Sequence, residues 1–220
     1  MNRQIILTED GSSSFFVPEL NEQYHSVHGA IQESTHVFIE AGLKQCLKNE
    51  ITVLEVGIGT GLNAFLTLIH AEKTKQKIKY IGIEKYPLTP DEYHSLNYAE
   101  LLSPEKSNVF EKIHSSDWET EIPITPTFSV HKIKADLRYF NTPPLPFFDV
   151  IYFDAFAPNK QPDLWQESVY KKIYEQANPG AIFVTYCAKG VVRRELTQSG
   201  FSVERIPGPP GKKEMLRATK

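Results

Sequence analysis

Residues 53–63 read VLEVGIGTGLN, and this stretch decides the fold of the chain. It predicts a buried strand at 53–56, a glycine-rich turn at 57–61 and the first residues of a helix. A strand that passes through such a turn into a helix builds a crevice at its carboxyl end, where α/β proteins bind nucleotides. The glycines let the backbone turn tightly and a ligand approach closely. An ordinary tight turn with no ligand is the alternative.

The spacing of the glycines indicates which nucleotide the crevice binds. A dinucleotide fingerprint, G-x-G-x-x-G, would need glycine at position 62, where this chain has Leu62. The pattern present is E-x-G-x-G-x-G, which resembles the first motif of class I S-adenosylmethionine-dependent methyltransferases. Its acid would repel a pyrophosphate but suits the cationic sulfonium and ammonium groups of that cofactor. The resemblance implies S-adenosyl-L-methionine as the cofactor, with candidate ligands Glu55, Gly57, Gly59, Gly61 and Asn63.

Two further acids follow predicted strands on the rim of the same crevice. Glu84 ends the second strand, 23 residues after Gly61, where a carboxylate can accept hydrogen bonds from both hydroxyls of a ribose. Its neighbour Lys85 is also a candidate cofactor ligand. Asp136 follows the third strand and is positioned to accept from an adenine amino group, although capping of the next helix is an alternative role.

The candidate catalytic residue is Asp154, which is also a candidate cofactor ligand and follows the apolar run predicted as a strand at 148–153. Parallel strands end at the same edge of a sheet, so this carboxylate should lie beside the cofactor. The aromatic and proline residues after it resemble the fourth motif of amine-methylating enzymes. A primary amine is protonated in water and cannot attack carbon, and a carboxylate can orient it and remove its proton. Capping of the next turn is the alternative role.

Strands alternate with helices along most of the chain, which predicts a doubly wound α/β fold. We expect a Rossmann-like, mostly parallel sheet of seven strands, with an antiparallel pair at its end. Residues 5–20 predict a small N-terminal β-hairpin around Asp10-Gly11. The expected division is an N-terminal extension at 1–28 and a methyltransferase domain at 29–220. Pro143–Pro146 predicts a rigid loop.

The composition is that of a globular protein in the cytoplasm. The chain has 220 residues, 40% hydrophobic and 23% charged, with no apolar run near membrane-spanning length. Its two cysteines match no metal spacing, and no metal site is expected. Residues 189–220 carry a net charge of +5, although the whole chain carries −3. This basic segment indicates either a face for a polyanion or a solvated lysine-rich surface.

Three longer runs resemble one family of methyltransferases. They are FDAFAPNKQPDLW at 153–165, GVVRRxL at 190–196 and GKKEML at 211–216. Tyr24-His25-Ser26 adds a fourth element. The family is the methyltransferase half of the bifunctional tRNA 5-methylaminomethyl-2-thiouridine biosynthesis protein, together with stand-alone versions of that half.

The resemblance implies a substrate and a partner. The acceptor would be the primary amine of 5-aminomethyl-uridine, or of its 2-thio form, at the tRNA wobble position. The bifunctional relatives have a second, FAD-dependent half that exposes this amine. For this chain the resemblance implies either a separate enzyme that supplies the aminomethyl form or a different route to it. The anticodon arm would meet basic residues, which position phosphates without reading sequence. These are Lys160, Arg193, Arg194, Lys212 and Lys213.

Aromatic residues in or near these runs are candidates for stacking on an extruded base. They are Phe156, Trp165 and Tyr186, with packing in the core as the alternative for Trp165. Glu33 would reach the cofactor or the acceptor amine, or lie on the surface. His25 and His28 are interpreted as structural.

Two other functions fit parts of this pattern. A polyamine aminopropyltransferase shares the fold, the N-terminal hairpin and an acid near the acceptor amine, but it leaves the basic segment unexplained. A tRNA-binding protein that lost catalysis would show damage to the glycine turn or to Asp154, and these residues are intact.

Overall fold

The computed structural model describes residues 1–137 and 145–220, so the proline loop expected at Pro143–Pro146 lies partly outside the described residues. The strands of the central sheet are β4 (Glu50–Val56), β5 (Lys77–Glu84), β6 (Glu121–Thr125), β7 (Phe128–Lys134), β8 (Phe148–Phe153), β9 (Ala177–Thr185), β10 (Ser202–Pro207) and β11 (Glu214–Thr219). Within the described ranges their order is β10-β11-β9-β8-β4-β5-β7-β6. The middle of the sheet is parallel, and β6, β10 and β11 run antiparallel to their neighbours.

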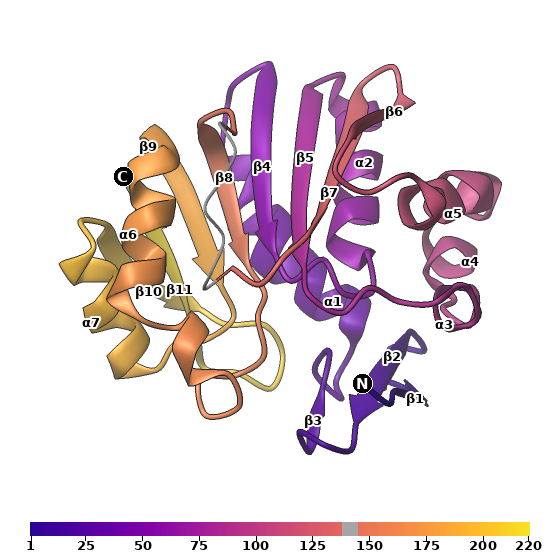
Figure 1. Cartoon of the computed structure of the whole chain (residues 1–220), viewed down its shortest axis with the longest axis horizontal. Coiled ribbons are helices and arrows are strands. Elements are labelled where there is room, and N and C mark those ends of the chain that lie inside the picture. The colour runs from indigo at the N-terminus through magenta and orange to yellow at the C-terminus, as the bar shows by residue number, and fades with distance from the viewer. Residues whose placement is uncertain (138–144) are drawn as a thin grey trace.

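Helices cover both faces of the sheet, as Figure 1 shows. The α-helices are α1 (Ala30–Ser34), α2 (Leu62–Thr74), α3 (Pro90–His94), α4 (Tyr98–Leu102), α5 (Ser107–Ser115), α6 (Glu167–Gln176) and α7 (Gly190–Gln198). A π-helical segment, η1 (Thr35–Glu40), extends α1, and 3-10 turns lie at η2 (Leu43–Gln45), η3 (Pro104–Lys106) and η4 (Pro162–Leu164).

The two faces have separate hydrophobic cores because side chains alternate along each strand. In β4, Val53 belongs to the core beneath α2, whereas Leu54 belongs to the core beneath α6 and α7. In β8, every residue is buried, as expected for a central parallel strand. The doubly wound α/β prediction is therefore confirmed.

Three details of the predicted architecture differ. The sheet contains β6 in addition to the seven expected strands. Pro123 weakens the strand pattern of this segment in the sequence, but a proline is tolerated on an edge strand such as β6. The N-terminal hairpin is a three-stranded sheet of β1 (Gln4–Leu7), β2 (Ser13–Val17) and β3 (Glu22–Gln23), since β3 is too short to show a pattern. The apolar spacing over 30–47 predicts one continuous helix, whereas α1 passes into the π-helical η1, which ends at Glu40. The domain boundary at residue 28 stays a prediction.

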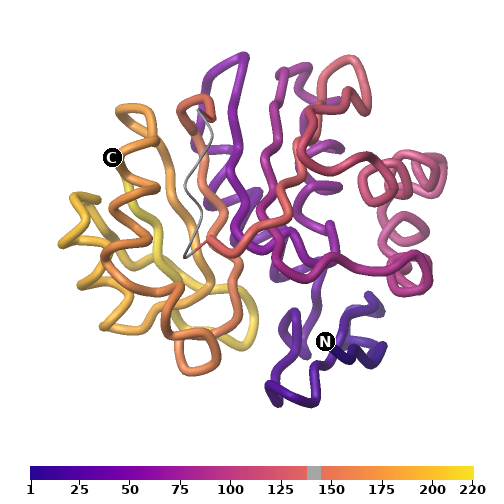
Figure 2. Tube along the Cα trace, in the orientation of Figure 1, coloured from indigo at the N-terminus to yellow at the C-terminus, as the bar shows by residue number. Residues whose placement is uncertain are grey.

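The N-terminal sheet and the turn between β10 and β11 both lie at the carboxyl ends of the parallel strands (Figure 2). His36 Nε2, in η1 after the N-terminal sheet, lies 2.9 Å from the carbonyl oxygen of Pro207, the last residue of β10. Segments from both ends of the chain therefore surround the crevice that the glycine turn opens.

Candidate active site

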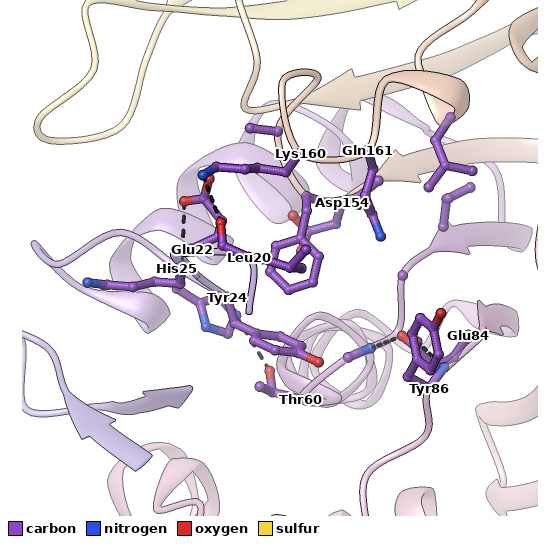
Figure 3. A pocket seen from close by; sticks show the side chains of 18 of the residues that line it. Leu20, Glu22, Tyr24, His25, Thr60, Glu84, Tyr86, Asp154, Lys160 and Gln161 are labelled. Carbon is purple, nitrogen blue, oxygen red and sulfur yellow. Dashed lines mark hydrogen bonds between the residues drawn. The ribbon is translucent and has the colours of Figure 1, made fainter. Parts of the chain in front are cut away.

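The crevice is a cavity of about 780 Å³ at the carboxyl ends of β4, β5 and β8. The N-terminal sheet, the glycine turn and the loop after β8 form its walls. This volume lies within the usual range for small-molecule sites. Figure 3 shows Glu84 on one side of the cavity, Tyr24 and His25 on another, and Asp154 on a third side with Lys160 and Gln161.

The glycine turn is shaped by its neighbours. Gly57 has φ of +87°, and a Cβ there would lie 2.8 Å from the Asp154 carbonyl oxygen. The turn therefore packs directly against the segment that carries the candidate catalytic residue. Gly61, with φ of +71°, caps α2, and Asn63 follows in the first turn of that helix.

Glu84 is held at the cavity by backbone groups. Gly59 N–H donates to Glu84 Oε2 at 3.1 Å, and Tyr86 N–H donates to Oε1 at 2.7 Å. A carboxylate oxygen accepts more than one hydrogen bond, so both oxygens keep capacity for ribose hydroxyls. Lys85 and Asp136 also line the cavity and form an ion pair at 3.0 Å. The structure thus places Glu84, Lys85 and Asp136, three charged residues expected around an adenosine, at one cavity.

Asp154 also lines the cavity, and Asn63 positions it. Asn63 Nδ2 donates to Asp154 Oδ2 at 2.9 Å and to Glu55 Oε1 at 2.8 Å. Burial, reinforced by the charge of Glu33, raises the pKa of Asp154 to about 7. A carboxyl group with this pKa exchanges a proton near neutral pH, as a general base must.

Glu55 departs from the direct cofactor contact expected of it. Its side chain is fully buried behind the cavity wall, where Tyr80 O–H donates to Oε2 at 2.6 Å and Asn63 donates to Oε1. Burial raises the pKa of Glu55 to about 8. Glu55 fixes the orientation of the Asn63 amide, and so it acts on Asp154 through Asn63 instead of touching the ligand space.

The aromatic candidates have different surroundings. Phe156 lines the cavity and packs edge-on against Tyr24, with ring centroids 5.0 Å apart. Trp165 is 3% exposed, packs against Phe153 and donates from Nε1 to the Phe156 carbonyl oxygen at 2.8 Å. Trp165 therefore supports the loop that carries Phe156, and it is not accessible to an extruded nucleotide base.

The basic candidates also divide into two groups. Arg193, Arg194 and Lys213 are exposed, as a phosphate contact requires. Lys160 Nζ donates to the Leu20 carbonyl oxygen at 2.7 Å and joins the loop after β8 to the N-terminal sheet. Lys212 points into the cavity wall and pairs with Glu33, which is 7% exposed. Neither Lys160 nor Lys212 occupies the position expected of a phosphate ligand.

Two lining residues had no assigned role in the sequence. Tyr24 O–H accepts from Arg3 Nε at 2.8 Å, and its ring lies against Gly59. Gln161 Oε1 accepts from Phe156 N–H at 3.1 Å. His25 lines the cavity, and burial lowers its pKa to about 4, which keeps the ring neutral.

The described residues hold no cluster of three or more His, Cys, Asp or Glu that could bind a metal. No described helix is long and apolar enough to cross a membrane.

The fold and the site together define a Rossmann-like transferase that binds an adenosyl cofactor across a glycine turn. Residues 97–220, more than half of the chain, match the family described as S-adenosyl-L-methionine-dependent methyltransferase. The chain belongs to this family. The predicted class of enzyme and its cofactor are thereby confirmed.

Relatives and solved structures support the family assignment. The chain is 29% identical over 238 residues to the tRNA 5-methylaminomethyl-2-thiouridine biosynthesis bifunctional protein MnmC of Burkholderia pseudomallei, covering 96% of this chain and 34% of that protein. The protein of the same name from Paraburkholderia xenovorans is 27% identical, with 91% and 32% covered. The chain spans about a third of the length of these curated relatives.

Two solved structures match most of the chain. MnmC2 from Aquifex aeolicus has a TM-score of 0.78 at 26% identity, covering 99% of this chain and 70% of that one. Spermidine synthase from Thermotoga maritima has a TM-score of 0.52 at 15% identity, covering 94% and 68%. The second likeness shows a shared fold alone, so it does not support the aminopropyltransferase alternative.

We expect Gly57→Ala to weaken cofactor binding at least tenfold and to lower Tm by a few degrees. The new Cβ would displace the Asp154 backbone, and the positive φ costs roughly 1–2 kcal/mol in any residue but glycine. Isothermal titration with S-adenosylmethionine and a thermal melt measure both effects. Gly180→Ala is the matched control, because Gly180 has φ of +78° and open space around it. Unchanged affinity in Gly57→Ala would contradict the packing argument.

Proposed function

We propose that the chain methylates the primary amine of 5-aminomethyl-uridine, or of its 2-thio form, at the tRNA wobble position. The names of the relatives specify a 5-methylaminomethyl-2-thiouridine product, and the methyl group on its amine is the part that a methyltransferase adds. The observation that carries the proposal is Asp154, a partly buried carboxylate with a raised pKa in the same cavity as Glu84 and the glycine turn.

The residues of the chain account for the steps that the amine needs. S-adenosylmethionine, when bound, supplies an electrophilic methyl group. Asn63 holds Asp154 Oδ2, which leaves the carboxylate able to take a proton from the acceptor ammonium. Loss of that proton frees the nitrogen lone pair for attack. Phe156 and Tyr24 provide aromatic surface for an extruded base.

The charges inside the cavity differ from those on the outer surface, and this difference directs the acceptor amine to the cavity and the tRNA phosphates to the surface. Among the described residues, the acids that line the cavity are Glu22, Glu33, Glu84, Asp136, Asp154 and Asp163, and the lysines that line it are Lys85, Lys160 and Lys212. An acidic interior attracts cations and repels phosphate. The exposed Arg193 and Arg194 lie on α7, whose N-terminus joins the loop after β8 through Lys189 Nζ and Asn159 Oδ1 at 3.3 Å. This outer surface would bind the anticodon arm, and a tRNA substrate would place the enzyme in the cytoplasm.

Another enzymatic activity has to supply the aminomethyl group in this scheme, because the described site accounts for methyl transfer alone. The proposal is tested with isotopically labelled cofactor and two forms of one tRNA. One carries 5-aminomethyl-uridine, and in the other this amine has been acetylated. Label should enter the first form and not the second. Equal labelling of both would reject the amine as acceptor, and transfer to putrescine in preference to either would favour a small-amine enzyme.

Replacing Arg193 and Arg194 by glutamine should weaken tRNA binding by roughly tenfold and make it less dependent on salt. A plot of log K against log salt concentration has a negative slope, and each lost phosphate contact makes that slope less negative by about 0.7–0.9. Filter binding at several salt concentrations measures this, and kcat at saturating tRNA should stay within about twofold. Lys73→Gln/Lys77→Gln removes the same charge from the opposite end of the sheet and serves as the control. Equal losses in both double variants would contradict a docking surface on α7.

A further inference from the structure

One wall of the cavity holds an ammonium group that belongs to the protein itself. Lys212 Nζ donates to Glu33 Oε1 at 2.6 Å and lies 4.1 Å from the centroid of the Tyr186 ring. A carboxylate beside an aromatic face is a common way to bind an alkylammonium ion. The end of a lysine side chain, –CH₂–NH₃⁺, is chemically the same group as a protonated aminomethyl substituent.

Both walls of this ammonium site are held by contacts that do not involve Lys212. Ser26 N–H donates to Glu33 Oε2 at 2.7 Å, and Tyr186 O–H donates to the Ala155 carbonyl oxygen at 2.9 Å. The carboxylate and the ring would therefore keep their positions if Lys212 moved away. Such a site is preorganised for a cation, because its groups are ordered before the cation arrives.

Lys212 is the more mobile member of the pair on geometric grounds. It lies in the turn between β10 and β11, and its side chain is 35% exposed, against 9% for Glu33. The Lys212 backbone N–H closes a local turn onto the Pro209 carbonyl oxygen at 2.9 Å, so the side chain can swing out without unfolding either strand. Glu33, by contrast, is fixed on α1 at the base of the cavity wall.

The ammonium site lies next to the candidate base. Tyr186 O–H donates to the carbonyl oxygen of Ala155, the residue after Asp154, and Glu33, Lys212 and Asp154 line the same cavity. The charge of Glu33 raises the pKa of Asp154, and the charge of Lys212 lowers it. Among the described residues that line the cavity, Lys160 contacts the Leu20 carbonyl oxygen and Lys85 pairs with Asp136, so neither is the partner of Glu33. Lys212 is therefore the cation that balances Glu33.

We propose that Glu33 and Tyr186 form the binding subsite for the ammonium group of the acceptor, and that Lys212 fills this subsite until the acceptor displaces it. This subsite proposal rests on the proposed function, because it assumes that the acceptor is a primary amine. It replaces the phosphate contact expected of Lys212 in the sequence. Exchange of one ammonium for another keeps Glu33 paired throughout, which avoids leaving a buried carboxylate uncompensated. It also delivers the acceptor amine beside Asp154.

The test uses ethylammonium chloride as the probe, with no tRNA. Lys212→Met keeps the aliphatic stem and removes the cation, and Lys212→Gln provides a second variant with a polar end. We expect both to bind ethylammonium at least tenfold more tightly than the wild type, as measured by saturation-transfer NMR titration. Adding Glu33→Gln should abolish the gain. Ethanol, the neutral analogue, should not bind. Lys77→Gln, which removes an exposed lysine at the far end of β5, should behave as the wild type.

Cofactor affinity within a few-fold of the wild type shows that each variant is folded. Variants that are folded but bind ethylammonium no better than the wild type would overturn the proposal, and so would a gain that survives Glu33→Gln. Weaker tRNA binding with no gain in ethylammonium affinity would return Lys212 to a phosphate contact. Since the probe is a simple amine, failure of tRNA methylation would leave this result unaffected, and the two proposals fail separately.

Discussion

Replacing Asp154 by asparagine should lower kcat by about 10²–10⁴-fold and leave the Kd of S-adenosylmethionine within a few-fold of the wild type. Asparagine keeps the size of the side chain and an oxygen that can accept from Asn63, but it cannot take a proton. Single-turnover methylation and isothermal titration measure the two quantities separately. Asp91→Asn, an exposed acid in the first turn of α3, is the control. Parallel loss of turnover and cofactor affinity would make Asp154 a cofactor ligand.

The pH dependence of the wild type provides a second readout of the same residue. The pKa of Asp154 is raised to about 7, so the carboxyl is protonated and inactive as a base below that pH. The single-turnover rate should therefore increase with pH and reach half of its plateau near pH 7. The residual rate of Asp154→Asn should lack this limb. A limb that persists unchanged in the variant would assign it to another group.

Replacing Glu84 by alanine should weaken S-adenosylmethionine binding by about 10²-fold. Hydrogen bonds to a charged group contribute roughly 1.5–3 kcal/mol each, and two ribose hydroxyls would lose their acceptor. The variant also frees Gly59 N–H and Tyr86 N–H, which anchor the glycine turn to the end of β5. Isothermal titration measures the loss, and kcat at saturating cofactor should change by less than about threefold.

Glu84→Gln separates the charge of this side chain from its position. The amide keeps one acceptor oxygen, so we expect an intermediate loss of affinity. If the affinity of Glu84→Ala equals that of the wild type, Glu84 has no role in holding the ribose.

Local sequence patterns predicted the parts of the site that lie within short segments. The glycine turn and Asp154 each follow a strand, Glu84 is the last residue of one, and parallel strands end at one edge of the sheet. Their placement around one cavity could therefore be predicted before the fold was known. The same holds for β8, whose unbroken apolar run indicates burial on both faces.

The contacts between distant segments could not be predicted in this way. Glu33 and Lys212 are 179 residues apart, and no local pattern relates them. The hydrogen bonds that connect Glu55 through Asn63 to Asp154 likewise depend on how α2 packs against β4 and β8. Trp165 belongs to a motif, yet only its burial shows that it supports the loop and does not face a base. Motifs thus identified the residues, and packing decided what each one contacts.

The most direct test of the account is mass spectrometry of nucleosides from tRNA carrying 5-aminomethyl-uridine, after incubation with the enzyme and methyl-labelled S-adenosylmethionine. The account predicts labelled 5-methylaminomethyl-uridine in the wild-type digest and its loss with Asp154→Asn. Cofactor binding without label in this nucleoside, or label on another atom of the tRNA, would contradict it.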